Sequence, residues 1–249
     1  MTTLSVDTSF TNINGQTFDK VREIPFTKEQ LIHIGKYITS SKHEPTDFFD
    51  EDYDLNSGVH IYQSLIDPKK AYRIYKEFAE PNFNGYSDDV LIQNLQERQP
   101  NISKTTFPFG VVTLDGRIIG QEIPYFDNSI NVLEYINKCL INDPIKLYKE
   151  LLEIICELYK NGITYVDVHP RNFMIGLEDK KINLIDFELS NIKFDSSSSL
   201  KDSLNNYRQT INYINQKLNL LNRLGSFIQV SSYDEAFEQL DDMQRKLRY

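Results

Sequence analysis

Apolar and polar residues alternate along the first half of the chain, as is typical of strands that bury one face. This pattern predicts four strands, at 59–66, 71–76, 109–114 and 117–124. Asp67-Pro68 is expected to turn the first pair and Asp115-Gly116 the second. Asp-Gly is a strong hairpin signal because Gly readily adopts the positive φ that tight turns require. With a helix expected over 87–98, the first half reads β-β-α-β-β.

In the second half, apolar residues recur every three or four positions, which predicts helices. The run at 144–161 has Asp143 as N-cap, Pro144 at the first helical position and Gly162 at its end. Its buried stripe is predicted to contain Leu147, Leu151, Ile154, Ile155 and Leu158. A second helical run carries Leu200, Leu204, Tyr207, Ile211, Ile214, Leu218 and Leu221. A last helix is expected to begin at Ser232, because a Glu three residues later completes a capping box.

Three other segments are assigned from their local pattern. Short strands are expected at 173–175 and 182–185, joined by a turn. Residues 196–199 form a run of polar residues that we interpret as a linker. Near the N-terminus, Thr27 as N-cap and apolar residues on one side predict a helix over 27–41, which we interpret as an appendage. The apolar residues of that helix are Leu31, Ile34 and Ile38.

The composition is that of a folded globular protein. Of 249 residues, 40% are hydrophobic and 25% charged, and this length allows one sizeable core or two small lobes that share a cleft. The net charge of -9 makes nucleic acid a poor partner, since phosphate contacts need clustered Lys and Arg. Cys139 and Cys156 lie in apolar stretches and indicate neither a disulfide framework nor a Cys-based metal site. Without a basic-apolar leader or a long apolar run, we expect a cytoplasmic protein with no membrane partner.

Three polar residues bracket the two short strands of the second half. Asn172 follows Asp167 by five positions, and the predicted hairpin after it returns the chain so that Asp186 can face both. Phosphoryl transfer uses such groups, because magnesium prefers carboxylate and amide oxygens and a second carboxylate orients the attacking hydroxyl. We therefore expect Asp167 to orient the acceptor, and Asn172 with Asp186 to hold the metal. The plainer alternative is that Asp167 caps a turn.

These residues resemble the catalytic segments of the protein-kinase-like superfamily. In that family an aspartate is followed five residues later by an asparagine, and an Asp-Phe pair ends a strand downstream. Asp167 matches the loop aspartate, Asn172 the asparagine, and Asp186 with Phe187 the metal-binding pair. His-Pro within the loop, and Glu188 in place of glycine, are similar to aminoglycoside phosphotransferases and choline kinases. His169 itself we interpret as structural more readily than catalytic.

The resemblance implies an α+β, bilobal protein-kinase-like fold, with a small β-rich N-lobe and a reduced helical C-lobe. The implied organisation is an extension with one helix, an N-lobe, a hinge and a C-lobe, at 1–50, 51–123, 124–128 and 129–249. The implied function is an ATP- and magnesium-dependent kinase that transfers the γ-phosphate to a hydroxyl of a protein or small molecule. The implied nucleotide contacts are Gly58, Arg73, Lys76, Pro124 and Tyr125, the last two in the hinge.

The sequence also departs from the family pattern. Strand alternation places Arg73, not Lys76, where the phosphate-binding lysine is expected, although a bulge would deliver Lys76 instead. Asp88 or Asp89 is the candidate partner for that cation. Tyr165 replaces the usual histidine, and no Ala-Pro-Glu segment follows Glu188.

These departures keep a second hypothesis open, in which the chain is a pseudokinase or a nucleotide-binding interaction module. Oligomerisation through the helix at 200–221 also stays open, beside the simpler interpretation that this helix packs on its own lobe.

Overall fold

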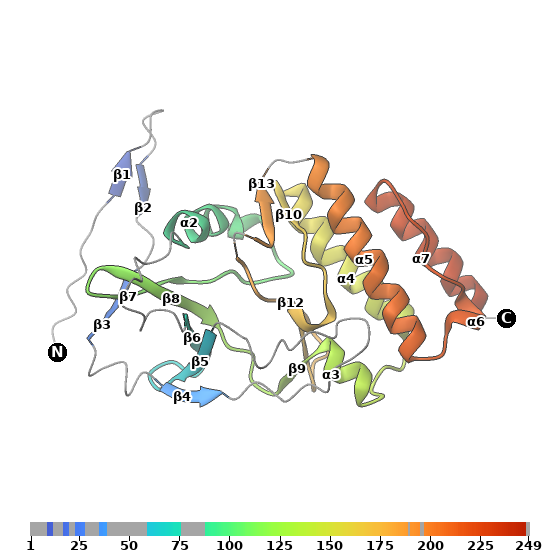
Figure 1. The fold of residues 1–249 in the computed structure, drawn as a ribbon, viewed down its shortest axis with the longest axis horizontal. Coiled ribbons are helices and arrows are strands. Elements are labelled where there is room, and N and C mark those ends of the chain that lie inside the picture. Colours follow the sequence, from blue (N-terminus) through green and yellow to red (C-terminus); the bar gives the residue numbers. More distant parts are fainter. Residues whose placement is uncertain are drawn as a thin grey trace. The chain divides into compact units, whose positions relative to one another are not determined.

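The computed structural model describes residues 9–11, 17–19, 23–27, 35–38, 59–75, 88–188, 190–194 and 197–247. Its contacts divide the chain into two compact units (Figure 1). Unit 1 comprises residues 1–39, 58–97 and 108–125, and unit 2 comprises residues 40–57, 98–107 and 126–249. Strands and helices occur in both, so the fold class is α+β, as predicted.

Unit 1 is built on a six-stranded sheet with the strand order β3-β7-β8-β6-β5-β4. Strand β3 pairs with β7 in parallel and the other pairs are antiparallel, so the sheet is mixed. The strands are β3 (Glu23–Phe26), β4 (Gly35–Ile38), β5 (Val59–Ser64), β6 (Lys70–Tyr75), β7 (Gly110–Leu114) and β8 (Arg117–Pro124). A separate two-stranded sheet pairs β1 (Ser9–Thr11) with β2 (Thr17–Asp19).

The two predicted hairpins of unit 1 are confirmed. Asp115 and Gly116 join β7 to β8 with φ of 51° and 73°, the positive values that the Asp-Gly turn was expected to adopt. Between β5 and β6, the Ser64 hydroxyl oxygen accepts hydrogen bonds from the main-chain N–H groups of Ile66 and Asp67. Main-chain geometry thus favours one turn and side-chain hydrogen bonds favour the other.

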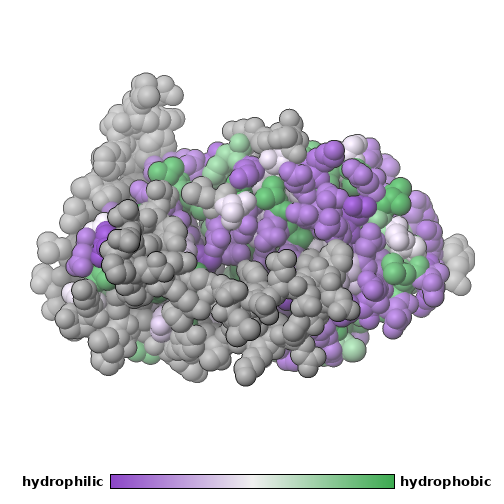
Figure 2. Space-filling model, in the orientation of Figure 1, coloured by the Kyte–Doolittle hydropathy of each residue, from purple (hydrophilic) through white to green (hydrophobic). Residues whose placement is uncertain are grey.

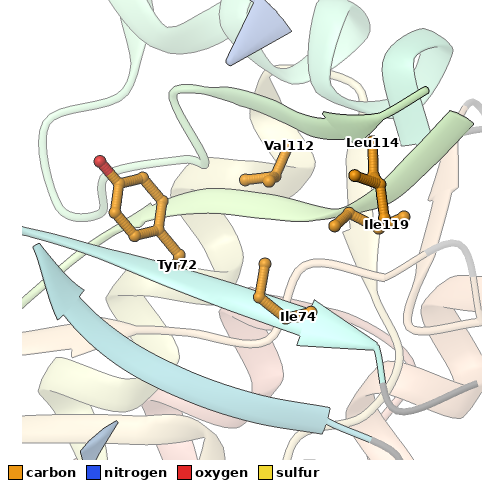
Figure 3. Close-up of a cluster of buried hydrophobic side chains, with 5 residues drawn as sticks. All are labelled: Tyr72, Ile74, Val112, Leu114 and Ile119. Carbon is orange, nitrogen blue, oxygen red and sulfur yellow. The ribbon is translucent and has the colours of Figure 1, made fainter. Parts of the chain in front are cut away.

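The two faces of the sheet carry different side chains. One face buries an apolar cluster formed by Tyr72, Ile74, Val112, Leu114 and Ile119 (Figure 3). Strand alternation places Arg73 and Tyr75 on the other face, where helix α2 (Asp88–Arg98) contributes Asp88. This helix lies where the sequence predicted it.

Unit 2 contains five helices among its described residues: α3 (Val132–Asn137), α4 (Pro144–Lys160), α5 (Ser197–Lys217), α6 (Leu221–Leu224) and α7 (Tyr233–Leu247). The predicted cap of α4 is confirmed, because Asp143 accepts a hydrogen bond from the N–H of Lys146 at 3.0 Å. Leu204, Tyr207 and Ile211 of α5 are buried within the chain. The face of this helical region seen in Figure 2 is mainly hydrophilic, as expected for amphipathic helices.

Two small sheets of unit 2 lie next to the helices. One has the order β12-β11-β9, with β9 (Ser129–Asn131), β11 (Phe173–Gly176) and β12 (Ile182–Leu184). The other pairs β10 (Ile163–Tyr165) with β13 (Ile192–Phe194) in antiparallel register. Short 3-10 turns, η2 (Gln99–Asn101) and η3 (Pro170–Asn172), complete the order of elements.

Three sequence predictions need correction. The helix predicted over 27–41 is wrong at 35–38, where β4 pairs with β5. Strands β3 and β4 belong to the main sheet, so these residues are not an appendage. The predicted linker over 196–199 is wrong from Ser197 onward, because α5 begins there. In the described part of the chain, every helix is too short or too polar to cross a membrane.

Candidate active site

The hairpin β11–β12 brings two of the predicted site residues together, as the sequence analysis expected. Phe173 pairs with Leu184 and Ile175 with Ile182. The N–H of Ile185 then donates to the carbonyl oxygen of Asn172 at 2.8 Å, which extends the ladder by one step. Asn172, the residue before β11, is therefore next to the segment that leads into Asp186.

Asn172 also binds Asp167 directly. Its Nδ2 donates to Asp167 Oδ2 at 2.7 Å and to the main-chain oxygen of the same residue at 3.0 Å. The turn η3 makes this contact possible, because the N–H of Asn172 bonds to the carbonyl of His169 and Pro170 occupies the first turn position. With Nδ2 used by Asp167, the amide oxygen Oδ1 of Asn172 is the atom left to meet a cation.

The charge of Asp186 acts on Asp167. Burial raises the pKa of Asp167, the hydrogen bond from Asn172 opposes this effect, and the nearby charge of Asp186 raises the pKa further. The bond of Asn172 to Asp167 and the main-chain bond between Asn172 and Ile185 place the two carboxylates in the same region of unit 2. The structure thus brings Asp167, Asn172 and Asp186 together.

Asp186 has an unusual main-chain conformation, with φ of 66°. This left-handed region costs about 1–2 kcal/mol for most residues, although Asp and Asn enter it more readily. Surrounding groups hold the turn. The Tyr165 hydroxyl donates to the carbonyl oxygens of Ile185 and Asp186, at 3.2 and 3.4 Å, and the N–H of Glu188 donates to the Asp186 carbonyl at 3.2 Å.

Phe187 anchors the turn in the apolar interior. Its ring meets that of Phe107 edge to face, with centroids 4.9 Å apart, and that of Tyr165 at 6.0 Å. Phe187 is only 4% exposed. Because the packing of Phe187 fixes its position, the main chain of the adjacent Asp186 has little freedom to move.

Helix α5 supports the loop that carries Asp167. Asn206 Nδ2 donates to the carbonyl of Val166 at 2.6 Å, and Thr210 Oγ1 donates to the carbonyl of Val168 at 2.6 Å. These carbonyls flank Asp167 on both sides. Sequence reasoning missed Asn206 and Thr210, and the available signal was that the two polar residues lie four positions apart and so share one side of the helix.

His169 is held as a neutral side chain. Its Nδ1 accepts a hydrogen bond from the N–H of Arg171 at 3.1 Å, which caps the turn η3. Burial lowers the pKa of His169 to about 3, and the positive charge of Arg171 acts in the same direction. This geometry agrees with the interpretation of His169 as a structural residue.

The donor atoms at this site suit magnesium better than zinc. Among the described residues, no group of three His, Cys, Asp or Glu side chains is placed to hold a metal ion. Magnesium in nucleotide sites needs only one or two protein oxygens, with phosphates and water as the remaining ligands. The carboxylate of Asp186 and the amide oxygen of Asn172 meet that requirement.

The nucleotide contacts expected in unit 1 are described only in part. Gly58 and Lys76 lie outside the described residues. Arg73 lies with its guanidinium 5.3 Å from the centre of the Tyr75 ring. The N–H of Tyr125 already donates to the carbonyl of Lys69 at 2.8 Å.

Pro124 and Tyr125, the two nucleotide contacts expected in the hinge, have no N–H group to offer a base. Pro124 lacks an N–H and pairs with Lys70 in the β6–β8 ladder, and the N–H of Tyr125 is used by Lys69, so these two residues would contact a base through their carbonyl oxygens. Asp88, 6% exposed, accepts hydrogen bonds from Tyr75 Oη and from Gln121 Nε2. Asp89 is exposed.

No protein-family profile matches this chain, and no curated protein sequence matches it.

Proposed function

We propose that the chain is an ATP- and magnesium-dependent phosphotransferase of the protein-kinase-like superfamily, which transfers the γ-phosphate to a hydroxyl group. The observation that supports this most directly is the contact of Asn172 Nδ2 with Asp167 Oδ2 at 2.7 Å, beside the charge of Asp186. Two carboxylates and an amide in one region, held by buried supports, are the groups that phosphoryl transfer uses.

Each of the three residues has a distinct role in this proposal. Asn172 and Asp186 would hold magnesium, which neutralises charge on the nucleotide phosphates. Asp167 orients the acceptor hydroxyl and accepts its proton during attack. Because burial raises the pKa of Asp167, its carboxylate takes up a proton more readily than an ordinary aspartate does. The bond from Asn172 keeps that carboxylate in one orientation.

The proposal assigns nucleotide binding in unit 1 to Arg73 or Lys76, with Gly58 and the carbonyl groups of Pro124 and Tyr125. The bilobal kinase-like arrangement is part of the same proposal. We favour a small-molecule acceptor over a peptide because the segment between Asp186 and α5 is short. It comprises residues 187–196, and β13 takes up three of them. A docking segment for an extended peptide has little length available there.

The test uses the purified full chain, γ-labelled ATP and magnesium, with autophosphorylation and transfer to a panel of small hydroxyl compounds and proteins as readouts. Asp167→Asn should reduce phosphate transfer by about 10²–10⁴-fold while the protein stays folded, because the general base is lost. Asp143→Asn is the matched control, since Asn also caps helices and Asp143 is an exposed residue at the start of α4. Equal transfer by wild type and Asp167→Asn would refute the assignment.

The second candidate is a pseudokinase that binds nucleotide without transfer. The observation that favours it is Arg73, whose planar guanidinium lies against Tyr75 and is not equivalent to a lysine ammonium near phosphates. This candidate predicts a magnesium-dependent thermal shift with ATP, no labelled product with any acceptor, and no effect of Asp167→Asn. Transfer above background by the wild type excludes it.

A further inference from the structure

Asn191 connects the two chain segments that carry the carboxylates. Its carbonyl oxygen accepts a hydrogen bond from the N–H of Val166, the residue before Asp167, at 2.8 Å. Its side-chain Nδ2 donates to both the main-chain oxygen and Oδ2 of Asp186, each at 3.2 Å. Asn191 is 9% exposed, and nothing in the sequence motifs assigned it a role.

The double contact restricts Asp186 in a specific way. One nitrogen that binds both the carbonyl and the carboxylate of the same residue closes a ring, and this fixes the rotation of the side chain against its main chain. Two further bonds hold Asn191. The Ser190 hydroxyl donates to the side-chain oxygen Oδ1 of Asn191 at 3.2 Å, and the main-chain N–H of Asn191 donates to the carbonyl of Glu188 at 3.0 Å. The contact with Asn191 Nδ2 thereby fixes the position of Asp186 Oδ2.

We propose that Asn191 is a positioning residue, which holds the carboxylate of Asp186 in the orientation that binds the metal of the nucleotide complex. This inference rests on the proposed function. It goes beyond that function because it predicts how metal affinity is set. Groups that hydrogen-bond to metal ligands typically change metal affinity 10–100-fold when they are removed. A left-handed residue held by several neighbours is where such pre-organisation is expected.

The experiment measures magnesium dependence in place of turnover. The full chain is unfolded by heat at a fixed ATP concentration while magnesium is titrated, and the half-saturating magnesium concentration is recorded. Asn191→Ala removes the donor. Asn191→Asp keeps the size of the side chain but replaces the donor with a second negative charge, so it tests the hydrogen bond without leaving a cavity. Mn²⁺ replaces magnesium in a parallel titration.

Asn212 provides the matched control. Asn212 lies in α5 and, like Asn191, its side chain binds main chain. Its Nδ2 donates to the carbonyl of Phe227 and its Oδ1 accepts from the N–H of the same residue. Asn212→Ala should lower the melting temperature without moving the magnesium midpoint. Asp186→Asn should abolish the magnesium dependence.

The outcomes separate the inference from the proposed function. A rise of about tenfold or more in the magnesium midpoint for both Asn191 variants, with Asn212→Ala unchanged, supports the inference. If Asn191→Ala and Asn191→Asp are only less stable and keep the wild-type midpoint, Asn191 is structural and the inference is wrong, while the proposed function stands. If the wild type shows no magnesium-dependent shift with ATP, the proposed function itself fails, and the inference fails with it.

Discussion

Tyr165→Phe removes one oxygen atom and leaves the aromatic ring in place. The ring is fully buried and packs against Phe187, so the substitution opens no large cavity. The lost hydroxyl donates to two carbonyl oxygens, those of Ile185 and Asp186, at 3.2 and 3.4 Å. One donor shared at these distances contributes about as much as a single neutral hydrogen bond, or about 1 kcal/mol. For a chain of this size, we expect the melting temperature to fall by about 2–4 °C.

The functional effect should exceed what this loss of stability explains. Without the hydroxyl, the left-handed turn at Asp186 loses one of its hydrogen bonds. We therefore expect a lower affinity for magnesium, with a half-saturating concentration raised by up to about tenfold. Tyr148→Phe is the matched control, because the Tyr148 hydroxyl is also buried and donates to Asn215 Oδ1 at 2.8 Å. Urea denaturation gives the free energies of unfolding and a magnesium titration with ATP gives the midpoints. Equal midpoints for Tyr165→Phe and Tyr148→Phe would refute this reasoning.

Three further predictions concern stability. Gly120→Ala would place a Cβ in steric conflict with the carbonyl oxygen of Arg73, so denaturant unfolding should show a loss of about 1–3 kcal/mol, and wild-type stability would contradict this. Thr210→Val, which removes the bond to the loop carbonyl beside Asp167, should cost about 1–2 kcal/mol by the same assay and lower phosphate transfer, whereas Thr210→Ser should retain both. Burial alone would raise the pKa of Glu157, but hydrogen bonds from Lys104 and Ser103 lower it overall. The ionised Glu157 therefore stabilises the folded protein fully above about pH 5, and this contribution is lost as the pH falls through the lowered pKa. Glu157→Gln should therefore lose less stability than the wild type as the pH falls from 5 to 3, and parallel pH profiles would count against the assignment.

Local signals predicted much of the fold. Helix α4 was predicted from Asp143, Pro144 and Gly162, because caps and turn residues act within a few positions of the chain. The β7–β8 hairpin was predicted for the same reason, since Asp115-Gly116 supplies both positive φ values. These features depend little on distant contacts.

The features that sequence reasoning missed depend on distant partners. The spacing of apolar residues over 27–41 favours a helix, but Gly35–Ile38 gains ladder hydrogen bonds by pairing with β5, and pairing of this kind leaves no local pattern. Strand β13 is three residues long and pairs with β10, which lies much earlier in the chain. Tertiary context determined both outcomes.

In the candidate site, too, local spacing was predictive and contacts with distant residues were missed. Its hairpin and the proximity of Asp167, Asn172 and Asp186 followed from spacing alone. The supports did not, because Asn191 and Thr210 resemble ordinary polar surface residues in the sequence. Tyr165 was noted only as a departure from the family pattern, and the structure shows that its hydroxyl contacts the Asp186 carbonyl.

The positive φ of Asp186 limits which residues evolution can place there. If Asp186 binds metal as proposed, a lineage that lost this function would be under no pressure to keep a carboxylate, yet it would still need a residue that tolerates this backbone geometry. Glycine or asparagine is therefore the expected replacement at position 186 in inactive descendants, and β-branched residues should be rare.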